Sequence, residues 1–198
     1  MGKIFLLMGK STSGKDTIYR NLIQNEDLGL KKVVLYTTRP MRDGEVDGVQ
    51  YFFKNEKEYL ELKEAKKIIE ERTYYTNYGE WRYFTADDGQ IDLESGNYLV
   101  IGTLESFCYI RDYFGKDKVL PILIDVDARI RLERAMHREA KQVHPKYDEM
   151  CRRFLADEED FSDEKIENAG VERRFFNNGS IEDCISEITG FITEALNQ

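Results

Sequence analysis

The chain has 198 residues, 41% of them hydrophobic and 34% charged, a balance typical of one folded domain rather than of a disordered chain. Its formal net charge of −9 argues against a nucleic-acid partner, because surfaces that bind DNA or RNA are usually basic. No apolar run approaches the ~18 residues of a bilayer span, and three scattered cysteines are typical of reduced thiols. We therefore expect a cytoplasmic protein without a membrane partner.

Apolar runs alternate with amphipathic stretches along the chain, which is the pattern of an α/β protein with a parallel sheet. The apolar runs predict strands at 4–8, 32–36, 98–102, 119–126 and 172–176, and a short strand at 50–53. The amphipathic stretches predict helices at 15–24, 56–65, 128–140, 147–161 and 181–196. An acidic segment that follows the aromatic-rich stretch 68–85 is expected to be helical through Glu94. The expected core is a parallel sheet of about five strands covered by helices.

The most specific motif, Gly9-Lys10-Ser11-Thr12-Ser13-Gly14-Lys15-Asp16-Thr17, lies between the first predicted strand and the first predicted helix. Its two glycines allow a turn whose backbone N–H groups face an anion, and the helix that follows adds its positive end. This is the pattern of a P-loop, in which the lysine reaches the β- and γ-phosphates of ATP. The sequence thus predicts a three-layer P-loop NTPase fold. The predicted ATP-binding residues are Gly9, Ser11, Thr12, Ser13, Gly14, Lys15, Asp16 and Thr17.

The motif departs from the usual pattern directly after the lysine, where Asp16 takes the place of the serine or threonine that ligates magnesium. A carboxylate is also a good hard-oxygen ligand for Mg²⁺, and some other small-molecule P-loop kinases carry SGKD here. We therefore expect Mg²⁺ to accompany ATP, with Asp16 and Thr17 as its candidate ligands.

Two arginines, Arg39 and Arg42, lie three residues apart in a loop rich in charge and glycine. Such a pair can grip one phosphate monoester, and a nearby tyrosine hydroxyl can complete the site. The segment 36–53 resembles the acceptor-binding segment of the guanylate kinase family, which reads TTRxxRxGExxGxxYxF. Further similar elements are Ile69-Glu70, Asn77-Tyr78-Gly79, Arg152-Arg153-Phe154 with Asp160-Phe161, and Asn178-Gly179-Ser180-Ile181-Glu182.

The resemblance implies roles for the matching residues. The acceptor's phosphate would be held by Arg39, Arg42, Tyr51 and Tyr78. Glu70 would contact the guanine edge, with Glu71 as a substitute, and Asn178 would lie near the adenine of ATP. From the lid, Arg134 or Arg138 would act with Arg153 on the transferring phosphoryl group, so the catalytic set is Lys15, Arg39, Arg134, Arg138 and Arg153.

The departures from the family fall where guanine would be read. Leu35 stands in place of a serine, Glu80 in place of a small hydroxyl residue, and Thr103 at the end of a strand where the family has an acidic motif. Thr103 is still counted with the acceptor-binding residues. Three hypotheses remain open: a GMP kinase, a kinase of the same fold for another nucleotide or a sugar phosphate, and a non-catalytic binding module.

The resemblance also predicts how a single domain spanning 1–198 is organised. The core would comprise 1–36, 89–127 and 165–198, the acceptor-binding subdomain about 37–88, and the helical lid about 128–164. The acidic run at 157–160 is expected to be a solvated helix face beside the lid. We expect a monomer or a homodimer.

Overall fold

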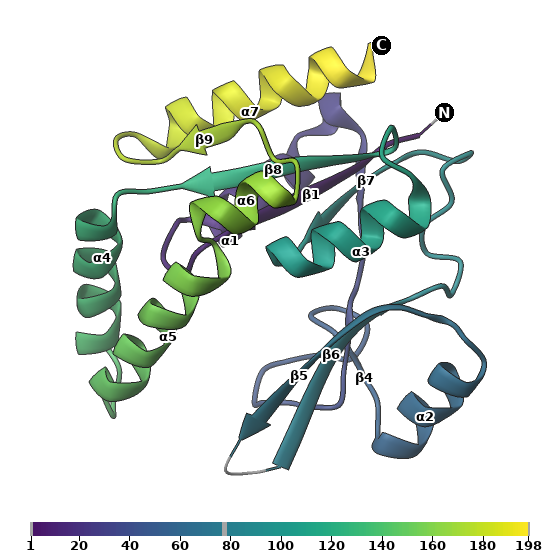
Figure 1. The fold of residues 1–198 in the computed structure, drawn as a ribbon, viewed down its shortest axis with the longest axis horizontal. Helices are drawn as coiled ribbons and strands as arrows, with labels where there is room; N and C mark the ends of the chain where they lie inside the picture. The colour runs from purple at the N-terminus through teal and green to yellow at the C-terminus, as the bar shows by residue number, and fades with distance from the viewer. Residues whose placement is uncertain (1, 77–78, 198) are drawn as a thin grey trace.

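The computed structural model describes residues 2–76 and 79–197 (Figure 1). Five strands form a central, fully parallel sheet, and their order across it is β2 (Leu30–Lys32), β7 (Asn97–Ile101), β1 (Ile4–Gly9), β8 (Val119–Asp125) and β9 (Arg174–Phe176). The predicted α/β fold with a five-stranded parallel sheet is therefore confirmed.

Strand β1 lies at the centre of the sheet and is buried on both faces. Ile4 aligns with Tyr98 of β7 on one side and with Val119 of β8 on the other. Because side chains alternate along a strand, Ile4, Leu6 and Met8 enter one apolar cluster and Phe5 and Leu7 enter the other. An unbroken apolar run is what a parallel strand covered on both faces requires.

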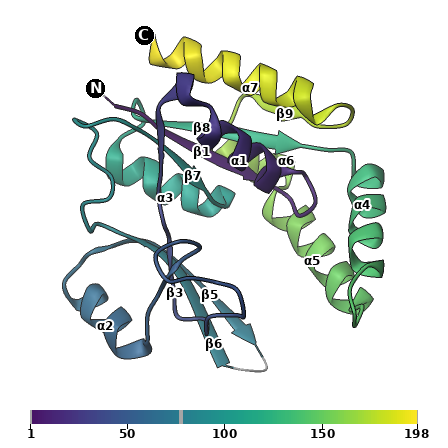
Figure 2. The same cartoon turned by 180° about the vertical axis from the view of Figure 1, so that it is seen from behind.

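Helices cover the two faces of this sheet and make three layers. One face packs against α1 (Lys15–Gln24) and α7 (Ile181–Leu196), and the opposite face packs against α3 (Leu104–Phe114) and α6 (Asp163–Asn168). Figure 2, the view from behind, shows α1 and α7 on the near side of the sheet. No helix in the described ranges combines the length and apolar character that a membrane span needs.

A second sheet lies beside the core and has the order β4 (Phe52–Phe53), β3 (Tyr36–Thr37), β6 (Gly79–Ala86) and β5 (Ile68–Thr76). Helix α2 (Glu56–Glu64) packs on it through Tyr59, and its first turn is closed by a capping box between Asn55 and Glu58. The side chain of Gln90 joins the two segments that connect this subdomain to the core, because it both accepts from the backbone N–H and donates to the C=O of Val34.

Two antiparallel helices, α4 (Ala128–Ala140) and α5 (Tyr147–Asp160), lie in the segment predicted to be a lid, and we call this helix pair the lid below. They are joined through Arg131, whose side chain is 1% exposed and which donates to Glu158 at 2.5 Å. The Arg131 guanidinium also lies 4.5 Å from the ring centroid of Phe154. Glu158 is partly exposed whereas Arg131 is buried, so removing Glu158 would leave a buried positive charge without its partner.

Three expectations from the sequence differ from the structure. The strand predicted at 32–36 is divided between β2 and β3, which belong to different sheets. The segment predicted to be helical through Glu94 forms turns, because Asp88 and Asp92 accept from the backbone N–H groups two residues ahead and so compete with a helix. Helices α3 and α6, and the short 3₁₀ turn at Glu26–Leu28, were not predicted.

Candidate active site

The phosphate loop runs from the end of β1 to the start of α1, and its shape depends on its two glycines. A Cβ atom on Gly9 would lie 2.7 Å from the carbonyl oxygen of Ile124. Gly14 has φ 90°, and a Cβ there would lie 2.6 Å from Nδ2 of Asn177. Thr12 adopts a positive φ of 63°, and its hydroxyl donates to the carbonyl of Arg131 at 2.9 Å. The loop is therefore held on both sides, by β8 and by the lid.

Asn177 holds the phosphate loop in place through a hydrogen bond to its backbone. Its Nδ2 donates to the carbonyl of Ser13 at 2.8 Å, and both residues are buried. Asn178, the residue predicted to lie near adenine, instead accepts from the backbone N–H of Asp127 at 2.9 Å and is otherwise exposed. Asn177 was not identified from the sequence, although an asparagine pair in the matching segment was the available signal.

Lys15 is half-buried at the first turn of α1. Burial lowers the pKa of its ammonium group, and Asp16 and Asp157 oppose this effect. The positive charges of Arg153 and Arg138 lower the same pKa further. Arg138 and Arg153 therefore lie near enough to Lys15 to influence its charge.

A cavity of about 400 Å³ lies between the phosphate loop and the lid. Its wall includes Ser11 and Thr12 from the loop, Arg42 from the acceptor segment, and Arg138 and Arg153 from the lid. His144 and Lys146, which the sequence analysis did not single out, also line it. Three of the predicted arginines therefore converge on a concave site beside the loop.

Arg134 does not share this placement. It lies on the lid helix α4, yet its Nη2 donates to the carbonyl of Asn177 at 3.0 Å, and it is absent from the wall of the cavity. Between the two candidates Arg134 and Arg138, the geometry favours Arg138 as the lid residue that faces the cavity.

Two acidic residues of the lid reach the phosphate loop. Asp157 accepts from the backbone N–H of Ser11 at 2.7 Å, and Glu158 pairs with Lys10 at 2.7 Å. Arg153 donates to the hydroxyl of Ser11 at 3.3 Å. The expectation that 157–160 is only a solvated face is therefore wrong for Asp157 and Glu158, because both bind groups of the phosphate loop. The sequence pattern of the helix does not reveal these contacts with a distant segment.

Arg39 and Arg42 differ in their surroundings. Arg39 is 3% exposed and forms a two-bonded pair with Glu45, at 2.7 and 3.0 Å, which raises its pKa. Its guanidinium lies 5.8 Å from the ring centroid of Tyr51. Arg42 is exposed, and its backbone N–H donates to Glu45. Glu45 thus fixes the loop that carries both arginines, and it leaves the side chain of Arg42 facing the cavity.

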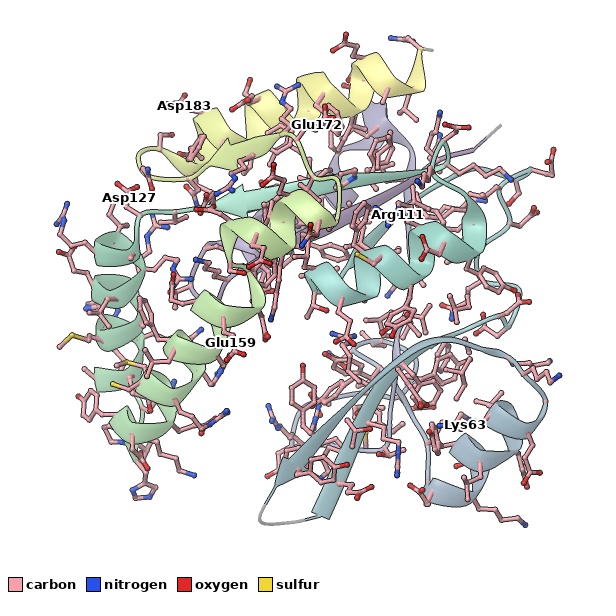
Figure 3. All side chains as sticks on the ribbon, viewed as in Figure 1. Lys63, Arg111, Asp127, Glu159, Glu172 and Asp183 are labelled. Carbon is pink, nitrogen blue, oxygen red and sulfur yellow. The ribbon has the colours of Figure 1, made fainter. Side chains whose placement is uncertain are left out.

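Glu70 and Glu71, the residues expected to contact the guanine, both bind other side chains of the protein. Glu70 is buried, with Arg72 as its ionic partner at 3.2 Å and the hydroxyl of Thr85 at 2.8 Å. Glu71 points to the opposite face of the strand and binds Tyr59 and Lys63, the latter labelled in Figure 3. Tyr78 lies outside the described residues.

The three departures from the family pattern, Leu35, Glu80 and Thr103, each contact other residues of the protein. Leu35 is 8% exposed and belongs to the apolar core, so it offers no hydrogen bond to a ligand. Glu80 pairs with Arg82 at 2.7 Å. Thr103 caps α3 by accepting from the N–H of Ser106 at 3.2 Å, and it lines a second cavity of about 500 Å³.

The chemistry of Asp16 and Thr17 suits a hard cation. Asp16 is exposed at the start of α1, and the Thr17 hydroxyl is close to it in sequence and accepts weakly from Arg20 at 3.4 Å. The described residues hold no cluster of three or more histidine, cysteine or acidic side chains arranged for a metal. Mg²⁺ is commonly bound through one or two protein oxygens together with substrate phosphates, and Asp16 and Thr17 carry oxygens of that kind.

Comparison with known proteins agrees with this geometry. Residues 1–83 match the family model described as guanylate kinase. A guanylate kinase of Bacillus cereus is 39% identical over 77 residues, which cover 39% of this chain and 38% of that protein. A guanylate kinase of Mycoplasma mobile is 42% identical over 77 residues, with the same shares of both chains.

A longer match is to guanylate kinase 2 of rice, chloroplastic/mitochondrial, at 28% identity over 139 residues, or 70% of this chain and 47% of that protein. The chain spans less than half the length of these curated relatives in each match.

A crystal structure of guanylate kinase from Anaplasma phagocytophilum aligns with 98% of this chain and 85% of that one, with a TM-score of 0.66 at 18% identity. This likeness extends the shared fold into the lid and the C-terminal helix, beyond the residues that match by sequence. The first 83 residues thus match the guanylate kinase family model by sequence, and the chain as a whole shares the fold of a solved guanylate kinase.

Proposed function

We propose that the protein is an ATP-dependent kinase that transfers the γ-phosphoryl group of ATP to a nucleoside monophosphate, with GMP as the first candidate. The observation that carries this proposal is the cavity in which Ser11 and Thr12 of the phosphate loop meet Arg42, Arg138 and Arg153. The relatives that match by sequence are guanylate kinases as well.

The proposed reaction needs alignment and charge neutralisation more than covalent help from the protein. The loop from Gly9 to Thr17 would cradle the triphosphate of ATP, and Lys15 would neutralise its terminal phosphates. Arg42 would hold the acceptor's phosphate, while Arg39, packed against Tyr51 and paired with Glu45, keeps that loop in place. One oxygen of the acceptor's phosphate would then attack the γ-phosphorus in line, and ADP would leave.

The lid supplies the remaining charges. Arg138 and Arg153 would stabilise negative charge on the transferring oxygens, because both line the cavity and act on Lys15. Asp16 and Thr17 would hold Mg²⁺, which neutralises charge on the phosphates. Since the lid helices approach the loop directly, they would also exclude water and so suppress ATP hydrolysis.

A second candidate is a kinase for another phosphorylated acceptor, either a different nucleotide or a sugar phosphate. It is favoured by the pairing of Glu70 with Arg72 and by the apolar Leu35, because both change the region that would read guanine. A non-catalytic binding module is less well supported, because the loop keeps Gly9, Gly14 and Lys15 of the phosphate-binding pattern.

The test is an ADP-release assay with ATP and Mg²⁺ against GMP, dGMP, AMP, CMP, UMP and a panel of sugar phosphates. Selective turnover of GMP supports the first candidate, and turnover of another acceptor with GMP inert supports the second. Arg42→Ala should lower kcat/KM for the acceptor about 10-fold or more, since a charge-assisted contact to phosphate is lost. No turnover with any acceptor would contradict both kinase proposals.

A further inference from the structure

We propose that Arg72, and not Glu70, meets the part of the acceptor that lies beyond its phosphate, and that the pocket therefore selects a head group rich in hydrogen-bond acceptors. The inference rests on the proposed kinase function, and it assigns a specificity-determining residue for the same acceptor to a second cavity, whose lining residues differ from those of the cavity beside the phosphate loop. It applies to the cavity of about 500 Å³ that lies between β5, α3 and α6.

Glu70 has little capacity left to receive a ligand. Its side chain is 1% exposed. Its Oε1 accepts from the Thr85 hydroxyl at 2.8 Å and from Nη2 of Arg72 at 3.4 Å, and its Oε2 accepts from Nε of Arg72 at 3.2 Å. A carboxylate offers about four lone-pair sites, so three are already occupied, and the group is covered by Arg72.

Arg72 has the opposite character. It contacts Glu70 through Nε and Nη2 only, and within the described ranges its Nη1 donates to no acceptor. Arg72 lines the cavity, together with Thr103 and Lys165, whereas Glu70 does not. A ligand that enters this cavity thus meets a guanidinium group, which is a donor without any acceptor capacity.

This inverts the hydrogen bonding that a free carboxylate would offer. The N1–H and 2-amino groups of guanine are donors, and a guanidinium leaves them unpaired, which is costly in a desolvated pocket. A guanidinium instead matches two acceptors side by side or a second anionic group. Such chemistry is found on the O6/N7 edge of guanine, on the O2/N3 edge of cytosine, and on the second phosphate of a sugar bisphosphate.

The experiment compares the wild type with Arg72→Ala and Arg72→Lys, using GMP, IMP, 7-deaza-GMP, CMP and a pentose bisphosphate. Turnover is followed by ADP release, and binding of each acceptor is measured independently by calorimetry. Arg72→Lys keeps a positive charge beside Glu70 while it removes the two-donor fork, so it tests the contact even where Arg72→Ala unfolds. Lys57→Ala, an exposed lysine of the same subdomain, is the charge-matched control.

We expect both Arg72 variants to weaken binding of the preferred acceptor about 10-fold or more, with the affinity for ATP and the control unchanged. If GMP is preferred, 7-deaza-GMP should be the poorer acceptor and IMP should match GMP. If CMP or the bisphosphate is preferred, and the Arg72 variants lose this preference, then Arg72 recognises the cytosine edge or the second phosphate instead.

The opposite pattern would overturn the inference. If IMP is a poorer acceptor than GMP while 7-deaza-GMP is as good, then Glu70 and not Arg72 recognises the base. If both Arg72 variants bind the acceptor as the wild type does, then Arg72 does not contact it. Absence of binding by every acceptor would overturn it as well. Binding through Arg72 without any turnover would keep the inference and refute the kinase proposal.

Discussion

Asp157 of the lid helix α5 accepts a hydrogen bond from the backbone amide of Ser11, in the phosphate loop, at 2.7 Å. Beside it Glu158 pairs with Lys10, so two neighbouring acidic residues lie against one side of the loop. In the proposed function that loop receives the triphosphate of ATP. The Asp157 carboxylate therefore satisfies an amide that an incoming phosphate would also seek, and it adds negative charge where phosphate must bind.

The first prediction is that Asp157→Asn tightens ATP binding. The amide side chain keeps the size of the carboxylate but removes a charge that repels phosphate over a few ångströms, which we expect to lower the Kd for ATP about 3- to 10-fold. Isothermal titration with Mg·ATP measures the change. The control is Glu159→Gln, because Glu159 lies on the same helix and is exposed (Figure 3). Equal effects in both variants would show that only net charge matters.

The second prediction separates two adjacent asparagines. Asn177→Ala should lower the free energy of unfolding by about 1–3 kcal/mol, because it leaves the buried carbonyl of Ser13 without its donor. Asn178→Ala is the matched control, and we expect a change below about 1 kcal/mol, because its side chain is exposed. Urea denaturation measures both values. A larger loss in Asn178→Ala would contradict the assignment of Asn177 as the loop's anchor.

The third prediction concerns acid stability. The hydrogen bonds from the Arg39 guanidinium hold the pKa of Glu45 below its usual value of 4.5. A carboxyl group with a lowered folded-state pKa stabilises the protein above the unfolded-state pKa, and this contribution is lost as the pH falls through the folded value. Glu45→Gln should therefore lower Tm at pH 7, and its difference from the wild type should shrink below pH 4.

Thermal unfolding between pH 7 and pH 3 checks this behaviour, with the exposed Glu64→Gln as the control. A difference between Glu45→Gln and the wild type that stays constant over this range would show that the ion pair does not stabilise the loop.

The fourth prediction concerns the thiols. Burial raises the pKa of Cys184 to about 11, whereas Cys151 is exposed on α5. Since the thiolate is the reactive form, a disulfide reagent at pH 8 should label Cys151 quickly and Cys184 only after denaturation. Cys151→Ser should abolish the fast phase. A fast phase that persists in this variant would mean that the half-buried Cys108 or the buried Cys184 is accessible in the folded protein, and Cys108→Ser in the same background tells the two apart.

The sequence predicted those features that depend on local pattern. The strand, turn and helix predicted around Gly9, Gly14 and Lys15 are confirmed. The glycines are a reliable local signal for this turn, because neighbouring atoms leave no room for a Cβ atom at either position. The three inner strands β1, β7 and β8 followed from their apolar runs, whereas the predicted strand 32–36 shares only Lys32 with the edge strand β2.

What the sequence did not predict depends on contacts between distant segments. The pairing of Glu70 with Arg72 is completed by Thr85, which comes from the neighbouring strand of the hairpin. The contact between Asp157 and Ser11 joins residues 146 positions apart. Neither partner carries a local signal, because an acidic residue on an amphipathic helix has the same pattern whether it meets solvent or a loop.

The position of β1 in the sheet has a consequence for how the chain acquires its structure. Strand β1 pairs with no strand that is near it in sequence, because Ile4 aligns with Tyr98 and Val119. The hairpin of β5 and β6 needs only local closure. Because local contacts form faster than distant ones, we expect the β5–β6 hairpin to gain order before the central sheet, and the phosphate loop to take its shape only after β1 has paired with β7 and β8.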